Sequence, residues 1–392
     1  MKDSYDLIVV GAGPAGSITA KTAAEKGLSV LLIEKRQEIG EPVRCAEAIL
    51  VKGLAEFTEP DPKWICAKIR HARFISPSGR SIEFKDRNND LAYVLDRKLF
   101  DRDLARKAAR SGADIYTKTP ATGLIVEHGI VKGITGKCIG DDFEARARVV
   151  VAADGIESRV ARWAGINTTL RRPDIGSCVQ YHIVHPDVRS DCFEFYLGNR
   201  RCPGGYVWVF PKGDGEANVG LGMTVNVGSG KTPLSYLDDF VASKFPGASV
   251  LQTFSGGVPV SRRLKHISTD GLVLVGDAAR LSDPATGEGI LNGMISGRIA
   301  GNVIADAIAS GDVSAGALKR YDDEISEQMG TVLDRNYLVK QFITSCSDLE
   351  LNLGVSALKM AQVERYFTTS RVYEEVFTTN LGMTGVLNLV FR

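Results

Sequence analysis

The chain has 392 residues, of which 44% are hydrophobic and 24% charged, and its formal net charge is +1 at pH 7. These proportions are ordinary for globular proteins, so they argue against a disordered chain, and the balanced charge argues against a nucleic-acid partner. No uninterrupted apolar run reaches the ~20 residues that a transmembrane helix needs. At ~150 residues per domain, the length suits two or three packed units.

The chain opens with the pattern of a strand, a tight turn and a helix, YDLIVVGAGPAGSITA. Residues 7–10 are an apolar run typical of a parallel strand that is buried on both faces. Three glycines with the spacing GxGxxG follow it: Gly11, Gly13 and Gly16. In a dinucleotide-binding unit the first makes the turn, the second lets the backbone approach a pyrophosphate, and the third lets the helix pack against the strand. The N-terminus of the helix then offers free N–H groups to phosphate.

A helix over about 15–26 and a second strand over 29–34 complete this unit. Gly27 is suited to end the helix, because glycine readily adopts the left-handed conformation found there. Glu34 ends the second strand, where an acid accepts hydrogen bonds from ribose hydroxyls. An acid at this place favours an unphosphorylated ribose, so the sequence predicts FAD or NAD rather than NADP.

The middle of the chain, residues 171–264, has short alternating segments separated by turn residues, which predicts a mainly antiparallel sheet. A strand over 206–210 would place Tyr206, Trp208 and Phe210 on one face, because strand side chains alternate. These aromatic residues suit the lining of an apolar substrate pocket and the plain core of a sheet equally well.

A second nucleotide-like segment, LVLVGDAARLSDPATGEGI, occupies residues 272–290. A strand over 272–275 leads to Asp277, and a helix is expected to start near Gly289. FAD requires such a second contact, because its ribityl chain separates the pyrophosphate from the flavin ring. We expect Asp277 to bind a ribityl hydroxyl or an oxygen near the phosphates. The helix N-terminus would face the N1–C2=O edge of the flavin and stabilise its anionic reduced form.

Several motifs together resemble the FAD-dependent hydroxylase-like superfamily: GAGPAG with Glu34, Asp96-Arg97, ADG at 153–155 and the GDAA segment. Within that superfamily, EPVRCAEAI at 41–49 and YVWVFP at 206–211 resemble the geranylgeranyl reductase family. The resemblance covers about residues 5–309. It implies an enzyme that uses FAD to reduce isolated C=C bonds in the geranylgeranyl chains of glycerophospholipids, thereby saturating membrane lipids.

The resemblance also assigns roles to single residues. Ala15 would lie on the pyrophosphate loop, Arg97 would reach the pyrophosphate or ribityl region, and Ala121 would face the adenine. The segment beside the flavin would contain Arg44, Cys45, Ala46 and Ala48, and the ribityl chain and ring edge would be held by Asp277, Gly287, Gly289 and Ile290. Cys45 is the one potentially reactive group in that segment. It would donate a proton to the alkene, gate movement of the flavin or simply fill space.

The implied fold class is α/β. A discontinuous Rossmann-like FAD-binding domain would consist of residues 1–70, 95–170 and 265–312. An antiparallel β-sheet substrate domain would consist of residues 71–94 and 171–264, and residues 313–392 would form a C-terminal helical region.

Localisation and partners follow less directly. Seven scattered cysteines without a signal peptide predict a cytoplasmic protein with mostly free thiols, in which Cys192 and Cys202 are more simply buried residues than a pair. A lipid substrate predicts peripheral contact with the cell membrane, and the uncharged stretch 376–391 is the candidate for it. Because no second GxGxxG is present, the electrons would come from a visiting NAD(P)H or a ferredoxin-like donor.

Two other functions share this sequence evidence. A flavin monooxygenase or halogenase would use the same FAD framework, although a halogenase is expected to carry Trp-x-Trp-x-Ile-Pro where this chain has YVWVFP. A prenyl-lipid carrier would use the fold without redox chemistry, and it would not need Glu34 and Asp277 in positions that suit a flavin.

Overall fold

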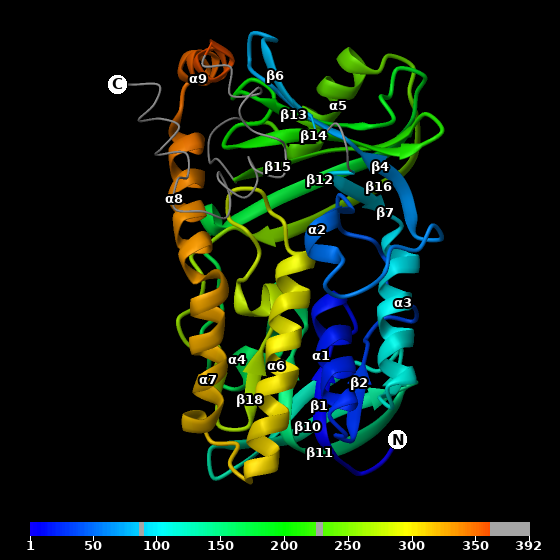
Figure 1. Cartoon of the computed structure of the whole chain (residues 1–392), viewed down its shortest axis with the longest axis vertical. Helices are drawn as coiled ribbons and strands as arrows, with labels where there is room; N and C mark the ends of the chain where they lie inside the picture. Colours follow the sequence, from blue (N-terminus) through cyan, green and yellow to red (C-terminus); the bar gives the residue numbers. More distant parts are fainter. Residues whose placement is uncertain (86–89, 225–229, 361–392) are drawn as a thin grey trace. The chain divides into compact units, whose positions relative to one another are not determined.

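Residues 1–85, 90–224 and 230–360 are described by a computed structural model of the chain, drawn in Figure 1. The stretch 376–391, the candidate for membrane contact, lies outside these ranges. Within them, no helix combines the length and apolar composition that crossing a bilayer requires. The chain divides into two compact units. Unit 1 is Met1–Val43, Arg97–Leu170 and Arg262–Leu333; unit 2 is Arg44–Asp96, Arg171–Ser261 and the chain from Asp334 onward.

An eight-stranded sheet forms the centre of unit 1. Its central strands are apolar and fully buried, which explains why they pair in parallel and are covered by helices. In spatial order the strands are β17 (Ser268–Thr269), β18 (Leu272–Leu274), β11 (Asp141–Ala152), β1 (Ser4–Val10), β2 (Val30–Ile33) and β8 (Asp114–Tyr116). Antiparallel pairing extends the sheet from β11 to β10 (Ile130–Cys138) and then to β9 (Ala121–Glu127).

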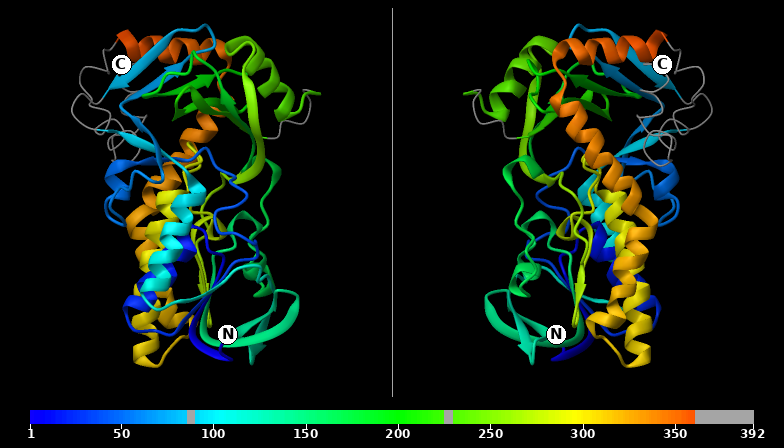
Figure 2. Two further views of the ribbon diagram at one scale, coloured as in Figure 1. Left: turned by 90° about the vertical axis from the view of Figure 1, so that its right-hand side faces the viewer. Right: turned by 90° about the vertical axis from the view of Figure 1, so that its left-hand side faces the viewer.

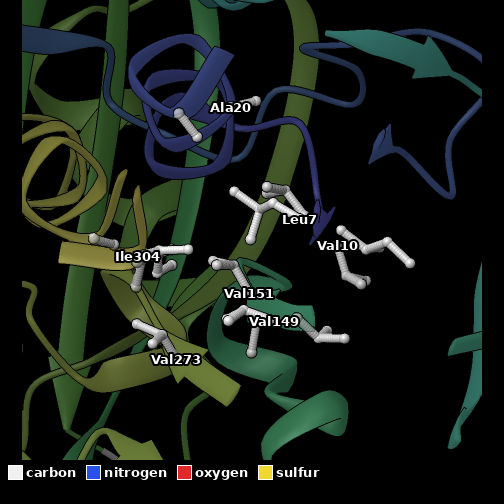
Figure 3. Packing of buried hydrophobic residues seen from close by; sticks show 14 of the residues in the cluster. Leu7, Val10, Ala20, Val149, Val151, Val273 and Ile304 are labelled. Carbon is white, nitrogen blue, oxygen red and sulfur yellow. The ribbon is translucent and has the colours of Figure 1, made fainter. Parts of the chain in front are cut away.

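The helices of unit 1 bury the apolar faces of this sheet. They are α1 (Pro14–Glu25), α3 (Arg97–Arg110), α4 (Arg159–Trp163), α6 (Ile290–Ser310) and α7 (Ala315–Ile325). In Figure 2, α3 and α6 lie along one face of the sheet and the β9–β10 ribbon lies toward the other. Figure 3 shows the centre of the core, where strand side chains meet two helices: Leu7, Val149, Val151 and Val273 with Ala20 and Ile304. The predicted strand–helix–strand unit at the N-terminus is confirmed.

Helices α1 and α6 pack unusually closely because α6 presents glycines to α1. A β-carbon on Gly297 would come within 2.4 Å of the Ala15 carbonyl oxygen, and one on Gly301 within 2.7 Å of Thr22 Cβ. Real β-carbons do not approach other atoms this closely, so these positions admit only glycine unless the helices separate. The contact fixes the start of α6 against the start of α1.

Unit 2 contains two sheets. The larger has the order β16 (Ser249–Pro259), β12 (Ile175–Val184), β15 (Glu216–Thr224), β14 (Gly205–Gly213), β13 (Cys192–Leu197), β5 (His71–Ile75) and β6 (Ser81–Lys85). The smaller has the order β3 (Ala48–Leu50), β7 (Ala92–Leu95) and β4 (Ile65–Ile69). The unit also contains the helices α2 (Val51–Leu54), α5 (Pro233–Lys244), most of α8 (Thr331–Ser345) and α9 (Asp348–Met360).

The two faces of the seven-stranded sheet bury different partners. One face packs on α5 through a cluster that includes Val207, Val209 and Leu237. The other face packs on the three-stranded sheet through a cluster that includes Trp208 and Phe210. The predicted antiparallel sheet is therefore present, although β13 pairs with β5 in parallel.

The division into units differs from the predicted domains at two places. Unit 1 ends its first segment at Val43 rather than near residue 70, because β3 and β4 pair with β7 of unit 2. Of the described C-terminal helices, α7 belongs to unit 1, whereas α9 packs on β6 of unit 2. The predicted domain bounds stay predictions. All seven cysteines are free, including Cys192 and Cys202.

Candidate active site

The glycine-rich loop of unit 1 connects β1 to α1, and two of its glycines are required by backbone packing. A β-carbon on Gly11 would come within 2.3 Å of the Ala153 carbonyl oxygen, and Gly11 has a φ of +111°. A β-carbon on Gly16 would come within 1.9 Å of the Gly11 carbonyl oxygen. These contacts hold α1 against the ends of β1 and β11, as the spacing predicts.

Gly13 has a different role from its neighbours. No atom lies within 4 Å of the place where its β-carbon would be, and its φ of −72° and ψ of −177° are open to any residue. The fold therefore does not require glycine here. The missing side chain leaves space beside the N-terminus of α1, where free N–H groups and the helix dipole attract a phosphate.

Glu34 follows β2 and turns its carboxylate back to the loop. Its Oε2 accepts a hydrogen bond from the Ala12 N–H at 3.1 Å, and its Oε1 accepts one from the Arg36 N–H at 2.9 Å. Each oxygen keeps a further lone pair for a ligand hydroxyl. The Thr119 N–H donates to the Glu34 carbonyl at 2.8 Å, which brings the segment before Ala121 alongside. Glu34 and Ala121 thus lie at the same edge of the sheet.

The second loop, between β18 and α6, meets the first loop at Ala15. A β-carbon on Gly276 would lie 3.1 Å from Ala15 Cβ, and one on Gly293 would lie 3.4 Å from it. A β-carbon on Gly289 would come within 3.1 Å of Asp277 Oδ1, so glycine lets that carboxylate lie against the start of α6. Two loops more than 200 residues apart in sequence therefore form one site.

The remaining predicted residues of this loop shape the start of α6. Gly287 has a φ of +75°, and its N–H donates to the Asp283 carbonyl at 2.8 Å. Ile290 is the first residue of α6 and is buried. Asp283, which the sequence analysis did not single out, accepts hydrogen bonds from the N–H groups of Ala285 and Thr286 and so orders the turn.

Buried charges surround this junction. Arg97 begins α3 and donates two hydrogen bonds of 2.8 Å to Asp101, one turn along the helix. Burial raises the pKa of Asp277 to about 6, and the Arg97 guanidinium opposes that shift. Burial also raises the pKa of Glu288 to about 7; the Leu291 N–H opposes the shift, whereas Asp283 and Asp277 add to it. Neutral forms of both carboxyls are therefore accessible near neutral pH.

Asp154 adds a polar atom without a partner. Its Oδ2 accepts a hydrogen bond from the Val160 N–H at 3.0 Å, whereas its Oδ1 is buried and meets no donor among the described residues. Asp154 follows β11 directly, next to the Gly11 turn. A buried acceptor of this kind is costly unless a ligand or water satisfies it. Together with the space at Gly13, it fits a polar ligand such as the predicted dinucleotide.

Unit 1 thus brings one group of predicted residues to the same end of its sheet: Gly11, Gly13, Ala15, Gly16, Glu34, Arg97, Ala121, Asp277, Gly287, Gly289 and Ile290. The other predicted residues belong to unit 2: Arg44, Cys45, Ala46, Ala48, Tyr206, Trp208 and Phe210. Most of this second group shares one apolar cluster, in which Ala46 and Ala48 pack with the three aromatic residues. The assigned roles of both groups stay predictions.

The aromatic cluster of unit 2 extends beyond the predicted residues. Phe193 and Phe195 of β13 join it, and the Phe193 and Phe210 ring centroids are 4.2 Å apart. Trp208 and Phe210 are buried, whereas Tyr206 is partly exposed. Gly220 lies opposite Trp208 on β15, where a β-carbon would come within 2.5 Å of the indole. The alternation in CFEFYLG would have revealed the two phenylalanines.

Cys45 is partly exposed and is held at three atoms of its segment. Its Sγ accepts a hydrogen bond from the Glu47 N–H at 3.2 Å, and its carbonyl accepts one from Gln180 Nε2 at 3.2 Å. The Ala46 carbonyl accepts a hydrogen bond from Asn218 Nδ2 at 3.3 Å. Burial raises the pKa of the nearby Cys178 thiol to about 12, and Cys45 adds to that shift, so Cys178 stays protonated.

Two family models match the chain. The geranylgeranyl reductase catalytic domain matches residues 174–258, and the pyridine nucleotide-disulphide oxidoreductase family matches residues 5–183. The digeranylgeranylglycerophospholipid reductase of Methanocella arvoryzae is 56% identical over 382 residues, which is 97% of each chain. The reductase of the same name from Methanosarcina acetivorans is 48% identical over 400 residues and covers 100% of this chain and 97% of the relative.

Solved structures agree with these relatives. A geranylgeranyl bacteriochlorophyll reductase-like protein from Thermoplasma acidophilum superimposes with a TM-score of 0.88 at 38% identity, covering 95% of this chain and 98% of the other. A flavin-dependent brominase superimposes with a TM-score of 0.73 at 20% identity, covering 99% and 98%. The brominase shows the shared fold alone. The oxidoreductase family model and the reductase-like structure together indicate a flavin cofactor.

Replacing Gly13 tests whether its open space serves a ligand. We expect Gly13→Val to fold and to lower the free energy of unfolding of the ligand-free protein by no more than about 1 kcal/mol, the usual cost of a poor N-cap. The valine would occupy the phosphate space, so the affinity for FAD, titrated by fluorescence quenching, should fall at least about tenfold. Gly16→Ala is the contrasting variant, since its clash with Gly11 should destabilise the fold itself. Unchanged FAD affinity in Gly13→Val would contradict this assignment.

Replacing Glu288 tests its raised pKa. Because the folded chain holds this proton more tightly than the unfolded chain, the associated stability is present at low pH and is lost as the pH rises from 4.5 toward about 7. Glu288→Gln keeps an oxygen for the Leu291 N–H but has no charge to bury. Its gain in unfolding free energy should therefore grow by about 1–2 kcal/mol between pH 5.5 and pH 8.5, measured by denaturant unfolding. The exposed Glu144→Gln is the control, and a gain that does not depend on pH would refute the prediction.

Proposed function

The chain belongs to the digeranylgeranylglycerophospholipid reductase family, and on that premise we propose that it binds FAD and reduces isolated C=C bonds in the geranylgeranyl chains of a glycerophospholipid. The observation that carries the proposal is the meeting of the two loops at Ala15. An elongated dinucleotide with a polyol between its pyrophosphate and its ring needs both loops at once. A single glycine-rich loop would serve NAD equally well.

In this proposal, different residues of unit 1 bind different parts of FAD. The loop around Gly13 and the N-terminus of α1 bind the pyrophosphate, and Glu34 accepts hydrogen bonds from the adenosine ribose. Asp277 binds the ribityl chain, and the N-terminus of α6 at Gly289 places its N–H groups at the ring edge. Arg97, fixed by Asp101, balances negative charge near the phosphates. When bound and reduced, FAD supplies the hydride.

The chain must supply the rest of the chemistry. An isolated alkene accepts a hydride poorly, because the resulting carbanion has no group to stabilise it, so a proton must reach the other carbon in the same step or earlier. Such a step needs the alkene to be aligned and water to be excluded. The aromatic cluster of Tyr206, Trp208 and Phe210 offers an apolar wall for this purpose, and the partly exposed Tyr206 is its accessible end.

We assign the proton to the Cys45 thiol. The S–H proton passes to one alkene carbon while the other carbon takes the hydride, and the remaining thiolate regains a proton from solvent. The Glu47 N–H, which donates to Sγ at 3.2 Å, stabilises that thiolate. Arg44 is exposed and adds a positive charge next to Cys45.

Electron supply and location complete the proposal. An external donor, NAD(P)H or a ferredoxin-like protein, reduces the flavin between turnovers. Because the substrate is a membrane lipid, the enzyme would work in the cytoplasm in peripheral contact with the membrane. A monooxygenase, a halogenase and a prenyl-lipid carrier are the alternatives, since the fold is shared with flavin-dependent brominases.

The first test is anaerobic. The protein should purify yellow; after reduction with dithionite, adding a digeranylgeranyl glycerophospholipid should reoxidise the flavin, and the lipid should gain mass in steps of two hydrogens. Bleached flavin that recovers its colour only with oxygen would favour a monooxygenase. A colourless protein that binds the lipid would favour a carrier.

Replacing Cys45 tests the proton assignment. We expect Cys45→Ser to retain its flavin spectrum and to lose at least about 100-fold in lipid reduction, because a general acid typically contributes a factor of this size. Cys138→Ser, at a cysteine of unit 1 outside the site, should keep its turnover. Undiminished turnover in Cys45→Ser would remove the thiol from the mechanism.

A further inference from the structure

A buried ion pair joins Lys212 to Glu47, which lies two residues after Cys45 in the chain. The side chains of Glu47 and Lys212 are only 4% and 13% exposed, and Lys212 Nζ donates a hydrogen bond to Glu47 Oε2. Asn218 Nδ2 donates to the same oxygen at 2.7 Å. Burial lowers the pKa of Lys212, but the attraction of Glu47 outweighs it and the net pKa is raised, so Lys212 stays charged.

Burying an ion pair rarely stabilises a fold more than apolar residues of the same size would. This pair therefore calls for another reason. The best attested one is that buried charge fixes a single arrangement of the segments that carry it. Here the segment is 44–48. The side chains that bind it come from three neighbouring strands of the seven-stranded sheet, β12, β15 and β14.

The backbone of Glu47 shows what is being fixed. Its φ is +71°, in the left-handed region that residues other than glycine rarely adopt. In this conformation its N–H donates to Cys45 Sγ and its carbonyl accepts from the Leu95 N–H at 2.8 Å. Lys212 Nζ also donates to the Leu95 carbonyl at 3.4 Å. Lys212 thus binds both the side chain of the strained residue Glu47 and the backbone of Leu95, to which the Glu47 carbonyl is hydrogen-bonded.

The carbonyls on either side of the thiol are held from the same sheet. Asn218 of β15 donates to the Ala46 carbonyl, and Gln180 of β12 donates to the Cys45 carbonyl. Trp208 Nε1 donates to Gln180 Oε1 at 2.9 Å, which leaves the Gln180 amide only one orientation. These two amides therefore restrict where the Cys45 backbone, and with it the sulfur, lies.

The geometry points to Glu47, Lys212 and Asn218 as a positioning clamp that fixes the Cys45 thiol through the Glu47 N–H. The three residues act through Cys45 and do not themselves contact the reacting carbons. The consequence for turnover rests on the proposed function, whereas the consequence for the thiol does not. The clamp makes Cys45 a more reactive thiol than its exposure alone would.

The test measures the thiol directly. Alkylation of Cys45 by iodoacetamide is followed by peptide mass spectrometry over a pH series, with and without added FAD. The signal is separable, because each cysteine lies on its own peptide and burial raises the pKa of five other thiols. That pKa is about 11 for Cys66 and about 12 for Cys178 and Cys192, and it is also raised for Cys202 and Cys346. Glu216→Gln is the matched control, since it removes a carboxylate that pairs with His182 on the same sheet but outside the clamp.

Two variants test whether the clamp controls the reactivity of Cys45. Glu47→Gly accepts the left-handed backbone but removes the clamp, and Glu47→Gln combined with Lys212→Met removes both charges without leaving one unpaired. In each, alkylation of Cys45 near neutral pH should slow by about 5- to 10-fold and its pH midpoint should rise, because Sγ loses a fixed N–H donor. The kcat for lipid reduction should fall while KM stays unchanged.

The outcomes separate the two proposals. A native alkylation profile in both variants, with a native circular dichroism spectrum, overturns the clamp whatever the turnover. Altered alkylation together with a fully active Cys45→Ser supports the clamp and removes Cys45 from the mechanism. If Glu47→Gly does not fold, the double variant decides alone, because it leaves no buried charge without a partner.

Discussion

The candidate site in unit 1 depends on backbone segments that approach one another more closely than any β-carbon allows. Gly16 lets α1 lie on the first loop, and Gly297 lets α6 lie on the Ala15 carbonyl. In each place a side chain on the glycine would push the two segments apart. The absence of that side chain therefore sets how closely the segments lie. The ligand space at Gly13 results from the same device, except that there no protein atom fills the gap.

The segment around Cys45 in unit 2 is fixed in a different way. It is held by added groups, a buried charge pair and two amides, rather than by the absence of side chains. The two devices suit different tasks. Glycine contacts give the proposed phosphate site a fixed backbone shape, whereas hydrogen bonds to single atoms orient the one side chain proposed to react. The aromatic cluster combines both, because Gly220 makes room for Trp208 and Gln180 binds its indole N–H.

Local patterns in the sequence predicted much of unit 1. The spacing of Gly11, Gly13 and Gly16, and the place of Glu34 at a strand end, follow from contacts between near neighbours in the chain, so both were recognisable. Alternation also predicted that Tyr206, Trp208 and Phe210 share a face. The pairing of Glu47 with Lys212 was not predictable, because 165 residues separate them and only the register of the sheet brings them together. The end of the first segment of unit 1 at Val43 also depends on distant pairing, since β3 and β4 find their partner in β7.

The order of segments has a consequence for synthesis on the ribosome. Each unit is assembled from three separate stretches, and the parallel core of unit 1 needs β18 and α6 to cover β11 and α1. The first 250 residues therefore emerge while that apolar surface is still unprotected, and the candidate site of unit 1 is incomplete until residue 293 has appeared. Nascent chains of this length expose surface that promotes aggregation. The topology therefore makes unit 1 a late product of synthesis, although its first strand is the first to emerge.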